Sequence, residues 1–202
     1  MTDPSGPQPS HQDLEGYELL VAVTGGIAAY KTCQVVSKLV QRGCGVTVAM
    51  TEAGTRFVGP VTFQALTGRR VFTSLWDADD RHDLHHVRLA ERADLFLIAP
   101  ATANIIGKMA TGIADDLVST MALSADSPIL LAPAMNDRMW TNPVVEQNVE
   151  RLRSFGVHFV GPETGWLSCR TIGVGRMAEP ETIIDAVTKL LTAHRPKSRT
   201  SS

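Results

Sequence analysis

Three side chains that could take part in chemistry lie far apart in this 202-residue sequence: His86, Asn136 and Cys169. The imidazole of His86 can give or take a proton near neutral pH. The amide of Asn136 can hold a carboxylate or carbonyl group, and the thiol of Cys169 can supply a proton. Two of them could instead have a purely structural role. Asn136 stands beside Met139 and Trp140, which are typical core residues, and a cysteine such as Cys169 is often simply buried. These residues form a site only if the fold brings them together.

A second signal is the glycine pair Gly25 and Gly26, directly after an apolar run. Glycines at a strand-to-helix turn let backbone N–H groups approach an anion, and the helix N-terminus adds its positive dipole end. The segment lacks the further glycines of G-x-G-x-x-G, and Tyr30 stands where a P-loop needs its second glycine. The turn therefore suits a ligand with one phosphate, although a tight turn without ligand has the same sequence features.

Polar residues also follow the next apolar runs. Thr51 follows the second run, and Thr102 and Asn104 follow the third, alternating with Ala101 and Ala103. The hydroxyl and amide groups could bind the polar edge of a ligand, while the alanines leave room for a flat ring. Both threonines are equally suited to cap the helices that begin after them, so a structural role stays open for each.

A loop rich in histidine and aspartate raises the question of a metal site. It contains Asp79, Asp80, His82, Asp83, His85 and His86. Histidine and aspartate are zinc ligands, but a polar loop of this composition without a cysteine pair is more typical of solvated side chains. We therefore expect no metal. His86 differs from its neighbours because the pattern that leads into the next strand begins there.

The candidate residues follow apolar runs that are too short for typical helices. These runs are Leu19–Thr24, Val46–Met50, Leu95–Ala99, Ile129–Ala132 and Val157–Val160. Helical patterns separate them, one ending at Gly43 and a closing one spanning Glu179–Ala193. Strands alternating with helices predict a single α/β domain with a parallel sheet covered on both faces. Ligands bind such sheets at the carboxyl ends of the strands, where the candidates fall.

Composition and charge limit the classes of function. The chain is 44% hydrophobic with a net charge of −2, which argues against disorder and against a general attraction to nucleic acid or anionic membranes. No apolar stretch approaches ~18 residues and no secretory signal opens the chain, so we expect no membrane span. Cys33, Cys44 and Cys169 form no C-x-x-C pair, which favours a cytoplasmic protein.

The two ends of the chain differ from its middle. Residues 1–16 are polar and rich in proline and glycine, which predicts a flexible leader, and residues 193–202 predict a flexible basic tail. Residues 17–192 form the expected domain.

Within that domain, residues 161–177 are rich in glycine and include Cys169. A loop of this length in a compact domain is usually a functional lid, and Gly165, Gly173 and Gly175 are predicted to be pivots of this flap.

Combined, these segments resemble the flavin-dependent cysteine decarboxylases. The stretches that carry the resemblance are TGGIAAYK at 24–31, HVRLAERAD at 86–94, PATAN at 100–104, PAMNDRMW at 133–140, and Cys169 with GRM at 175–177. PATAN and PAMNxxMW in this order and at this separation are a specific signature. The resemblance implies a Rossmann-like (flavodoxin-like) domain that binds FMN. It also implies a homotrimer or a dodecamer of trimers, with the flavin at a subunit interface.

The resemblance assigns site residues by position. For FMN it implies Gly25, Gly26, Ile27, Thr51, Thr102, Ala103, Asn104 and Ala134. For the substrate it implies Asn136, Met139, Trp166, Leu167 and Ser168. His86 would manage the thiol proton, Asn136 would hold the substrate carboxylate, and Cys169 would donate a proton.

The implied reaction is a decarboxylation without net redox change. Oxidation at the thiol-bearing carbon gives a thioaldehyde, loss of CO2 gives an enethiolate, and return of the hydride with a proton from Cys169 completes the cycle. The cysteine favours the branch acting on 4′-phospho-N-pantothenoylcysteine in coenzyme A biosynthesis. One departure is Arg170, because the family usually has glycine there. Bacterial members are commonly fused to a synthetase, and we expect this chain to act as a stand-alone decarboxylase.

Other interpretations stay open. A peptidyl-cysteine decarboxylase of lantibiotic maturation would stop at the enethiol. A non-catalytic flavin-binding regulatory relative would depend on acidic tails, whereas this C-terminal tail is basic. A flavin prenyltransferase would not need PAMNxxMW, and an electron carrier would leave the three candidate catalytic residues without a purpose. The identity of the product would separate these alternatives.

Overall fold

The computed structural model describes residues 13–76, 85–168 and 170–197, with the backbone alone for residues 85–88. At its centre is a six-stranded sheet in the order β3-β2-β1-β4-β5-β6, in which every pairing is parallel. Its strands are β1 (Glu18–Val23), β2 (Gly45–Met50), β3 (Val71–Phe72), β4 (Leu95–Ala101), β5 (Ile129–Pro133) and β6 (His158–Phe159).

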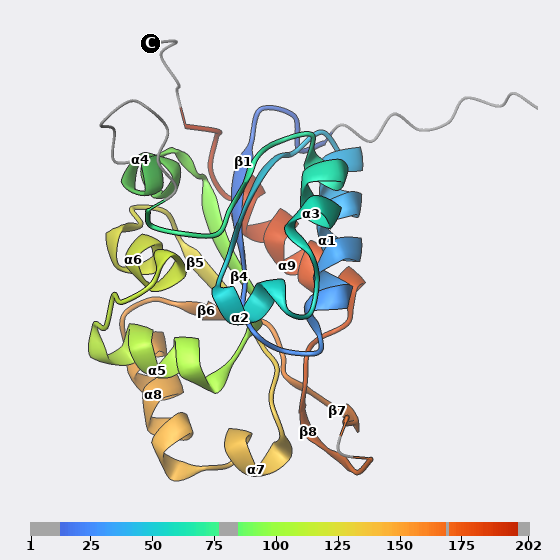
Figure 1. The fold of residues 1–202 in the computed structure, drawn as a ribbon, viewed down its shortest axis with the longest axis vertical. Coiled ribbons are helices and arrows are strands. Elements are labelled where there is room, and N and C mark those ends of the chain that lie inside the picture. Colours follow the sequence, from blue (N-terminus) through green and yellow to red (C-terminus); the bar gives the residue numbers. More distant parts are fainter. Residues whose placement is uncertain (1–12, 77–84, 169, 198–202) are drawn as a thin grey trace, which may run out of the picture.

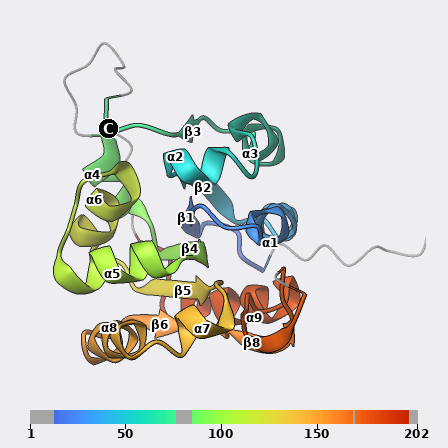
Figure 2. The ribbon, with the colours of Figure 1, turned by 60° about the horizontal axis from the view of Figure 1, so that its bottom comes forward.

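Helices cover both faces of this sheet (Figures 1 and 2). One face packs against α1 (Ala29–Gln41), α3 (Pro60–Thr67) and α9 (Pro180–Thr192). The other packs against α4 (His85–Arg92), α5 (Ala103–Thr111), α6 (Leu117–Ser124) and α8 (Pro143–Ser154). Short helices α2 (Glu52–Thr55) and α7 (Asp137–Trp140) follow β2 and β5. The predicted Rossmann-like α/β domain is confirmed.

The central strands are buried because helices cover both sides. In β1, Leu19 and Val21 face the core with α1 and α9, whereas Leu20 and Ala22 face the core with α5 and α6. This burial on both faces explains why these strands are continuous apolar runs. β4 continues through Pro100 to Ala101, with a register shift after Ile98, and is thus longer than the predicted run.

Topology places the carboxyl ends of β1 and β4 side by side. The chain leaves β1 toward β2 on one side and later returns to β4 on the other, so the strand order reverses between them. Such a reversal opens a crevice at the carboxyl edge, where ligands bind in this class of sheet. In Figure 1 this edge faces α2, α5 and α7.

The structure differs from the expected flexible leader and tail at their inner ends. Leu14 is fully buried in the core, and its backbone N–H donates to the carbonyl of Arg42. Near the other end, Lys197 donates from its backbone N–H to Asp94 and from Nζ to the carbonyl of Glu91. A single leucine in a polar segment gives no periodic signal, so the sequence could not reveal this anchor.

The described residues of the glycine-rich stretch form an antiparallel hairpin. β7 (Glu163–Trp166) pairs with β8 (Ile172–Arg176), and the pair forms a second sheet outside the main one. Figure 1 shows this hairpin projecting beyond the carboxyl edge of the main sheet, near α7.

Two of the predicted pivots are instead points of close contact. A side chain at Gly173 would lie 2.8 Å from Cβ of Asp137, and one at Gly175 would lie 2.4 Å from the carbonyl oxygen of Met135.

Candidate functional site

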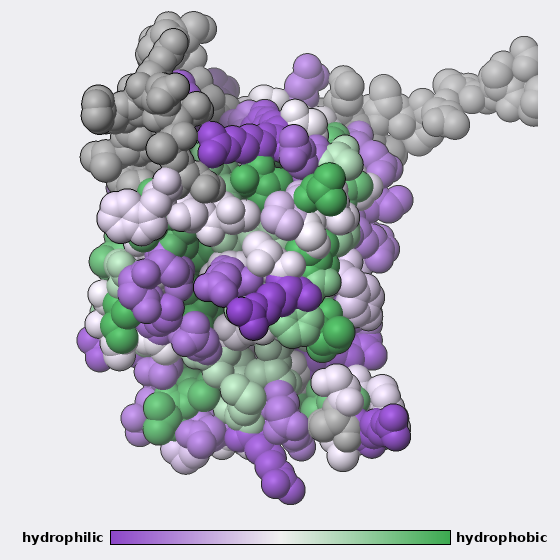
Figure 3. Space-filling view, in the orientation of Figure 1, coloured by the Kyte–Doolittle hydropathy of each residue, from purple (hydrophilic) through white to green (hydrophobic). Residues whose placement is uncertain are grey.

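A cleft of about 1230 Å³ lies at the carboxyl edge of the sheet, with the hairpin forming one of its walls. The turns after β1, β2, β4 and β5 contribute to it, as the topology requires. In Figure 3, hydrophilic residues over α2 border a paler, weakly hydrophobic surface that leads toward the hairpin. Every FMN and substrate residue that the resemblance implied contributes to the lining: Gly25, Gly26, Ile27, Thr51, Thr102, Ala103, Asn104, Ala134, Asn136, Met139, Trp166, Leu167 and Ser168.

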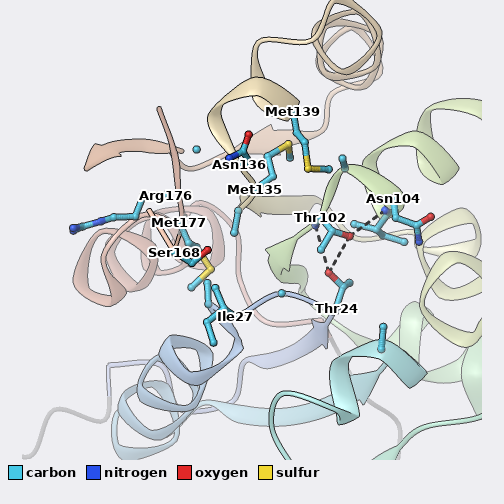
Figure 4. A pocket seen from close by; sticks show the side chains of 18 of the residues that line it. Thr24, Ile27, Thr102, Asn104, Met135, Asn136, Met139, Ser168, Arg176 and Met177 are labelled. Atoms are coloured by element: carbon cyan, nitrogen blue, oxygen red, sulfur yellow. Dashed lines mark hydrogen bonds between the residues drawn. The ribbon is translucent and has the colours of Figure 1, made fainter. Parts of the chain in front are cut away.

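Buried threonines hold the two central strands together at the base of the cleft. Thr24, only 2% exposed, donates from Oγ1 to the carbonyl of Pro100 at 2.6 Å. The same oxygen accepts from the backbone N–H of Thr102 at 3.4 Å (Figure 4). Thr32, fully buried in α1, donates to the carbonyl of Ala99 at 2.8 Å. These bonds fix the glycine turn and the PATAN segment relative to each other.

The glycine turn leaves a helix terminus open toward the cleft. A side chain at Gly25 would lie 2.5 Å from Cβ of Ala53, so only glycine fits between the two turns. α1 begins without a side-chain cap and without an acidic residue in its first turn. The positive dipole end of α1 therefore favours an anion in the space beside Gly26 and Ile27.

The two threonines whose role was open both cap a helix and line the cleft. Oγ1 of Thr51 accepts from the backbone N–H of Gly54 at 3.0 Å, capping α2. Oγ1 of Thr102 accepts from the backbone N–H of Ile105 at 3.4 Å, capping α5. Each hydroxyl is thus held at the cleft by its capping bond, so the two interpretations are compatible.

Asn136 is held at the wall of the cleft above Met135, as Figure 4 shows. Its Oδ1 accepts from the backbone N–H of Arg138 at 2.9 Å and caps α7. This bond orients the side-chain amide beside Met139, which lines the cleft with 47% exposure. Trp140 packs against the core formed with α5 and α8, as expected for a typical core residue.

Residues near the tip of the hairpin line the cleft on the side opposite the glycine turn. Trp166 is 63% exposed, whereas Leu167 is only 6% exposed. The backbone N–H of Met135 donates to the carbonyl of Gly175 at 2.9 Å, which ties β8 to the segment before Asn136. The hairpin and the PAMN segment are therefore one connected wall.

Sequence reasoning missed a set of charged residues at the cleft: Lys31, Glu52, Arg56, Lys108, Asp116, Arg176 and Glu179. Lys31 lies in the TGGIAAYK stretch and Arg176 in the GRM stretch, so a signal was present for both. Burial, followed by the nearby Arg176 cation, lowers the pKa of Lys31.

Lys108 lies 2.6 Å from carboxylate oxygens of both Asp115 and Asp116. Burial alone would lower the pKa of Lys108, but the hydrogen bonds to these carboxylates raise it. For Asp116, burial acts to raise the pKa, and the hydrogen bonds from Lys108 and the backbone of Ser119 outweigh it, so the pKa is lowered.

Two of the three candidate catalytic side chains lie outside the described part of the structure. Cys169 is among the residues that the structure leaves out, and His86 is described only by its backbone, in the first turn of α4. Asp79, Asp80, His82 and Asp83 of the loop considered for metal binding are outside it as well, and His85 is described only by its backbone. Among the side chains that are described, no group of His, Cys, Asp and Glu could hold a metal ion. In the described ranges, no helix is long and apolar enough to span a membrane.

Comparison with known proteins agrees with this geometry. The coenzyme A biosynthesis bifunctional protein CoaBC of Bacillus subtilis (strain 168) is 46% identical over 176 residues, which cover 87% of this chain and 43% of that protein. The chain thus spans less than half the length of this curated relative. The structure of a PPC decarboxylase mutant complexed with pantothenoylaminoethenethiol matches with a TM-score of 0.80 and 27% identity, covering 89% of this chain and 100% of the other.

The FMN-dependent cysteine decarboxylase SpaF matches with a TM-score of 0.76 and 30% identity, covering 89% of this chain and 98% of that one. The family model described as Flavoprotein matches residues 7–192, which is most of the sequence. This chain therefore belongs to the Flavoprotein family.

Proposed function

We propose that this chain decarboxylates 4′-phospho-N-pantothenoylcysteine to 4′-phosphopantetheine in coenzyme A biosynthesis, with FMN as cofactor and in the cytoplasm. The observation that carries the proposal is the cleft, which gathers the FMN and substrate residues implied by the sequence motifs at one edge of the sheet. The likeness to a PPC decarboxylase over the whole of that chain supports the same reaction, as does the CoaBC relative.

The residues at the glycine turn fit a flavin mononucleotide. The uncapped N-terminus of α1 would receive its single phosphate, and Gly25 lets the neighbouring turn at Ala53 pack closely beside it. Thr51 would add a hydroxyl from the neighbouring turn, and Ala103 and Ala134 leave room for a flat ring. A bound flavin would supply the two-electron acceptor that a cysteine substrate lacks.

The wall opposite the glycine turn would bind the substrate. The Asn136 amide, oriented by its bond to the Arg138 backbone, would hold the carboxylate that is lost. Met139 and Leu167 would provide apolar contacts, while Trp166 and Ser168 would exclude water from above. A carboxylate held out of the plane of the reacting carbons leaves more readily, because its breaking bond then overlaps the acceptor orbitals.

Two proton-handling roles complete the proposal and rest on the family resemblance. His86 would take the thiol proton of the substrate, and Cys169 would return a proton to the carbon after CO2 is lost. Substitutions test the carboxylate-binding role of Asn136 and the proton-handling role of His86. Asn136→Asp and His86→Asn should each reduce turnover by about 100-fold while flavin stays bound, and an undiminished rate in either variant would exclude its role.

We also propose that the chain assembles as a homo-oligomer, either a trimer or a dodecamer of trimers. Apolar side chains at the mouth of the cleft support this proposal: Ile27, just before α1, is 61% exposed, and Tyr30, in the first turn of α1, is 62% exposed. Exposed apolar groups next to a binding site are typical of surfaces that another subunit covers. Light scattering of the purified protein with and without FMN would measure the mass, and a monomer under both conditions would exclude the assembly.

The decisive experiment is the mass of the product after incubation of the purified protein with phosphopantothenoylcysteine. Loss of CO2 alone is the expected result. Loss of CO2 together with two hydrogens would mean an enethiol product, and the role of Cys169 would be wrong. No change in mass with a flavin-loaded protein would reject this substrate in favour of a peptidyl cysteine or a non-catalytic role.

A further inference from the structure

Four charged side chains meet where the hairpin joins the body of the protein. We call Lys31, Glu163, Arg176 and Glu179 the stem cluster. They come from α1, the first residue of β7, the last residue of β8 and the residue before α9. Glu163 and Arg176 face each other across the hairpin, so they mark the point from which both strands project.

In the stem cluster, each of the two carboxylates has one partner for each of its oxygens. One oxygen of Glu179 accepts from Arg176, and the other accepts from Nζ of Lys31 at 3.1 Å. One oxygen of Glu163 accepts from the backbone N–H of Glu179 at 3.3 Å, and the other lies 4.0 Å from Arg176. Two cations and two carboxylates thus balance each other in charge.

Lys31 connects this cluster to the wall that carries the glycine turn. Its side chain is only 13% exposed, and Nζ also donates to the carbonyl of Met177 at 3.4 Å. Lys31 lies in the first turn of α1, directly after the glycine turn expected to hold the phosphate. Lys31 therefore links the helix beside the glycine turn to the chain at the base of the hairpin.

Arg176 lies along the hairpin, at the edge of the cleft. A side chain at Gly165, in the opposite strand, would lie 3.0 Å from Cδ of Arg176, so the absence of a side chain there makes room for it. In Figure 4, the side chain of Arg176 points away from Ile27 and Thr102. Its position suits a structural link at the edge of the site better than contact with a ligand in the centre.

We propose that the stem cluster positions the hairpin over the cleft, so that its members are positioning residues for the proposed reaction. Trp166, Leu167 and Ser168 line the cleft from the hairpin, beyond the stem. Contacts at the base of a projecting hairpin govern where its far end lies. The inference concerning catalysis rests on the proposed function, whereas the inference concerning hairpin geometry does not.

The test is hydrogen–deuterium exchange of the full chain, with and without FMN, for Glu179→Gln against wild type. Glu179 makes no side-chain capping bond to α9, so the substitution removes charge without removing a cap. We expect the amides of β7 and β8 to exchange roughly fivefold faster, while those of β1 and β4 are unchanged. Hairpin exchange equal to that of wild type would overturn the proposal.

A matched control breaks a different ion pair of the same helix. Asp13→Asn removes the partner of Arg42, which follows the C-terminal end of α1, far from the hairpin. Its hairpin exchange should equal that of wild type, and equal acceleration in both variants would overturn the proposal. Lys31→Gln should repeat the effect of Glu179→Gln and also serves if that variant does not fold, while Lys31→Arg should restore slow exchange.

Kinetics then link the hairpin to the substrate. In Glu179→Gln we expect kcat/KM for phosphopantothenoylcysteine to fall about fivefold, because the hairpin residues proposed to act on the substrate are held less firmly, while flavin content stays that of wild type. An unchanged kcat/KM would contradict a positioning role. The exchange measurement needs no substrate, so it can reject the role of the stem cluster even if the wild-type protein turns over phosphopantothenoylcysteine. Equally, the wild-type protein can fail to turn over this substrate while the exchange result supports the role of the stem cluster.

Discussion

The two sides of the cleft are built from different kinds of structure. The side formed by the strand ends rests on the sheet core, where Thr24 and Thr32 are almost wholly buried and bond to strand β4. The hairpin side stands outside the main sheet, and its cross-strand pair Trp166 and Ile172 is 63% and 75% exposed. Elements with few buried contacts open at lower free energy than a core sheet. This difference predicts a rigid side at the glycine turn, where we propose that FMN binds, and an adjustable side at the hairpin, where we propose that the substrate binds.

The largest effect is expected from a side chain placed where the glycine turn packs against Ala53. Gly25→Val would place carbon atoms within 2.5 Å of Ala53, so the turn or α2 must move. We expect bound flavin to fall at least roughly tenfold, because the close approach of these backbones forms the cradle. Visible absorbance per mole of purified protein measures this.

Gly59→Ala is the matched control, since its nearest neighbour, Cγ1 of Val61, is 3.9 Å away. It should retain flavin. Full flavin content in Gly25→Val would contradict the assignment of a rigid cofactor side.

A second substitution tests the contact between the hairpin and the PAMN segment. Gly175 has a φ of +144°, and an added side chain would meet the carbonyl oxygen of Met135 at 2.4 Å. We expect Gly175→Ala to reduce turnover by roughly tenfold through a displaced hairpin, at a cost of about 1–3 kcal/mol in backbone strain. Flavin content should stay near wild type, because the cofactor side is intact.

Gly165→Ala provides the comparison within the hairpin. Its added carbon would meet only the flexible side chain of Arg176, at 3.0 Å, so a smaller loss is expected. If Gly175→Ala lost flavin and turnover in equal measure, the two sides of the cleft would not be separable.

A third prediction concerns acid stability on the cofactor side. The lowered pKa of Asp116 means that its charged form favours the folded state, so this stabilisation is present at neutral pH and is lost as the pH falls through the folded pKa. Asp116→Asn keeps a residue able to cap α6 but cannot titrate. As the pH falls below about 4, the free energy of unfolding of Asp116→Asn should decrease by about 0.5–1 kcal/mol less than that of wild type.

Urea unfolding across this pH range measures the difference. Parallel pH dependence in both proteins would show that the contact between Lys108 and Asp116 adds no net stability.

The smallest effect is expected at the tip of the hairpin. Arg170 has a φ of +65°, a left-handed conformation that glycine adopts more readily than residues with a Cβ. Relief of the left-handed conformation in Arg170→Gly should raise the free energy of unfolding by about 0.5–1 kcal/mol. The greater freedom of glycine in the unfolded chain opposes this gain, so the net increase should be smaller. Urea unfolding measures it, and a loss of stability would mean that the arginine side chain stabilises the hairpin.

Much of the fold and of the cleft could be predicted from local sequence. Runs such as Leu95–Ala99 and Ile129–Ala132 mark strands covered on both faces, and the structure places strands β4 and β5 there. Once the sheet is parallel, the turns after its strands must share one edge. That is why Thr51, Thr102 and Ala134 could be assigned to the same cleft before their neighbours in space were known.

The hairpin was harder to predict because its strands are not apolar. Neither strand has a buried face that would impose an alternating pattern, as the burial of Glu163–Trp166 and Ile172–Arg176 shows. Their glycines are also typical of a loop, so the sequence predicts a loop there. Gly173 and Gly175 are needed because Asp137 and Met135 lie against them, which no local pattern can indicate.

What the sequence by itself determined is therefore the set of local elements, the order of the strands along the chain and the turn residues after them, because burial and turn chemistry act over a few positions. Only the tertiary structure decided which charges meet. Lys31 and Glu179 are 148 positions apart and form an ion pair because α1 and α9 pack on the same face of the sheet. Long-range pairing depends on how helices pack in three dimensions, and that packing brings the stem of the hairpin to the edge of the cleft.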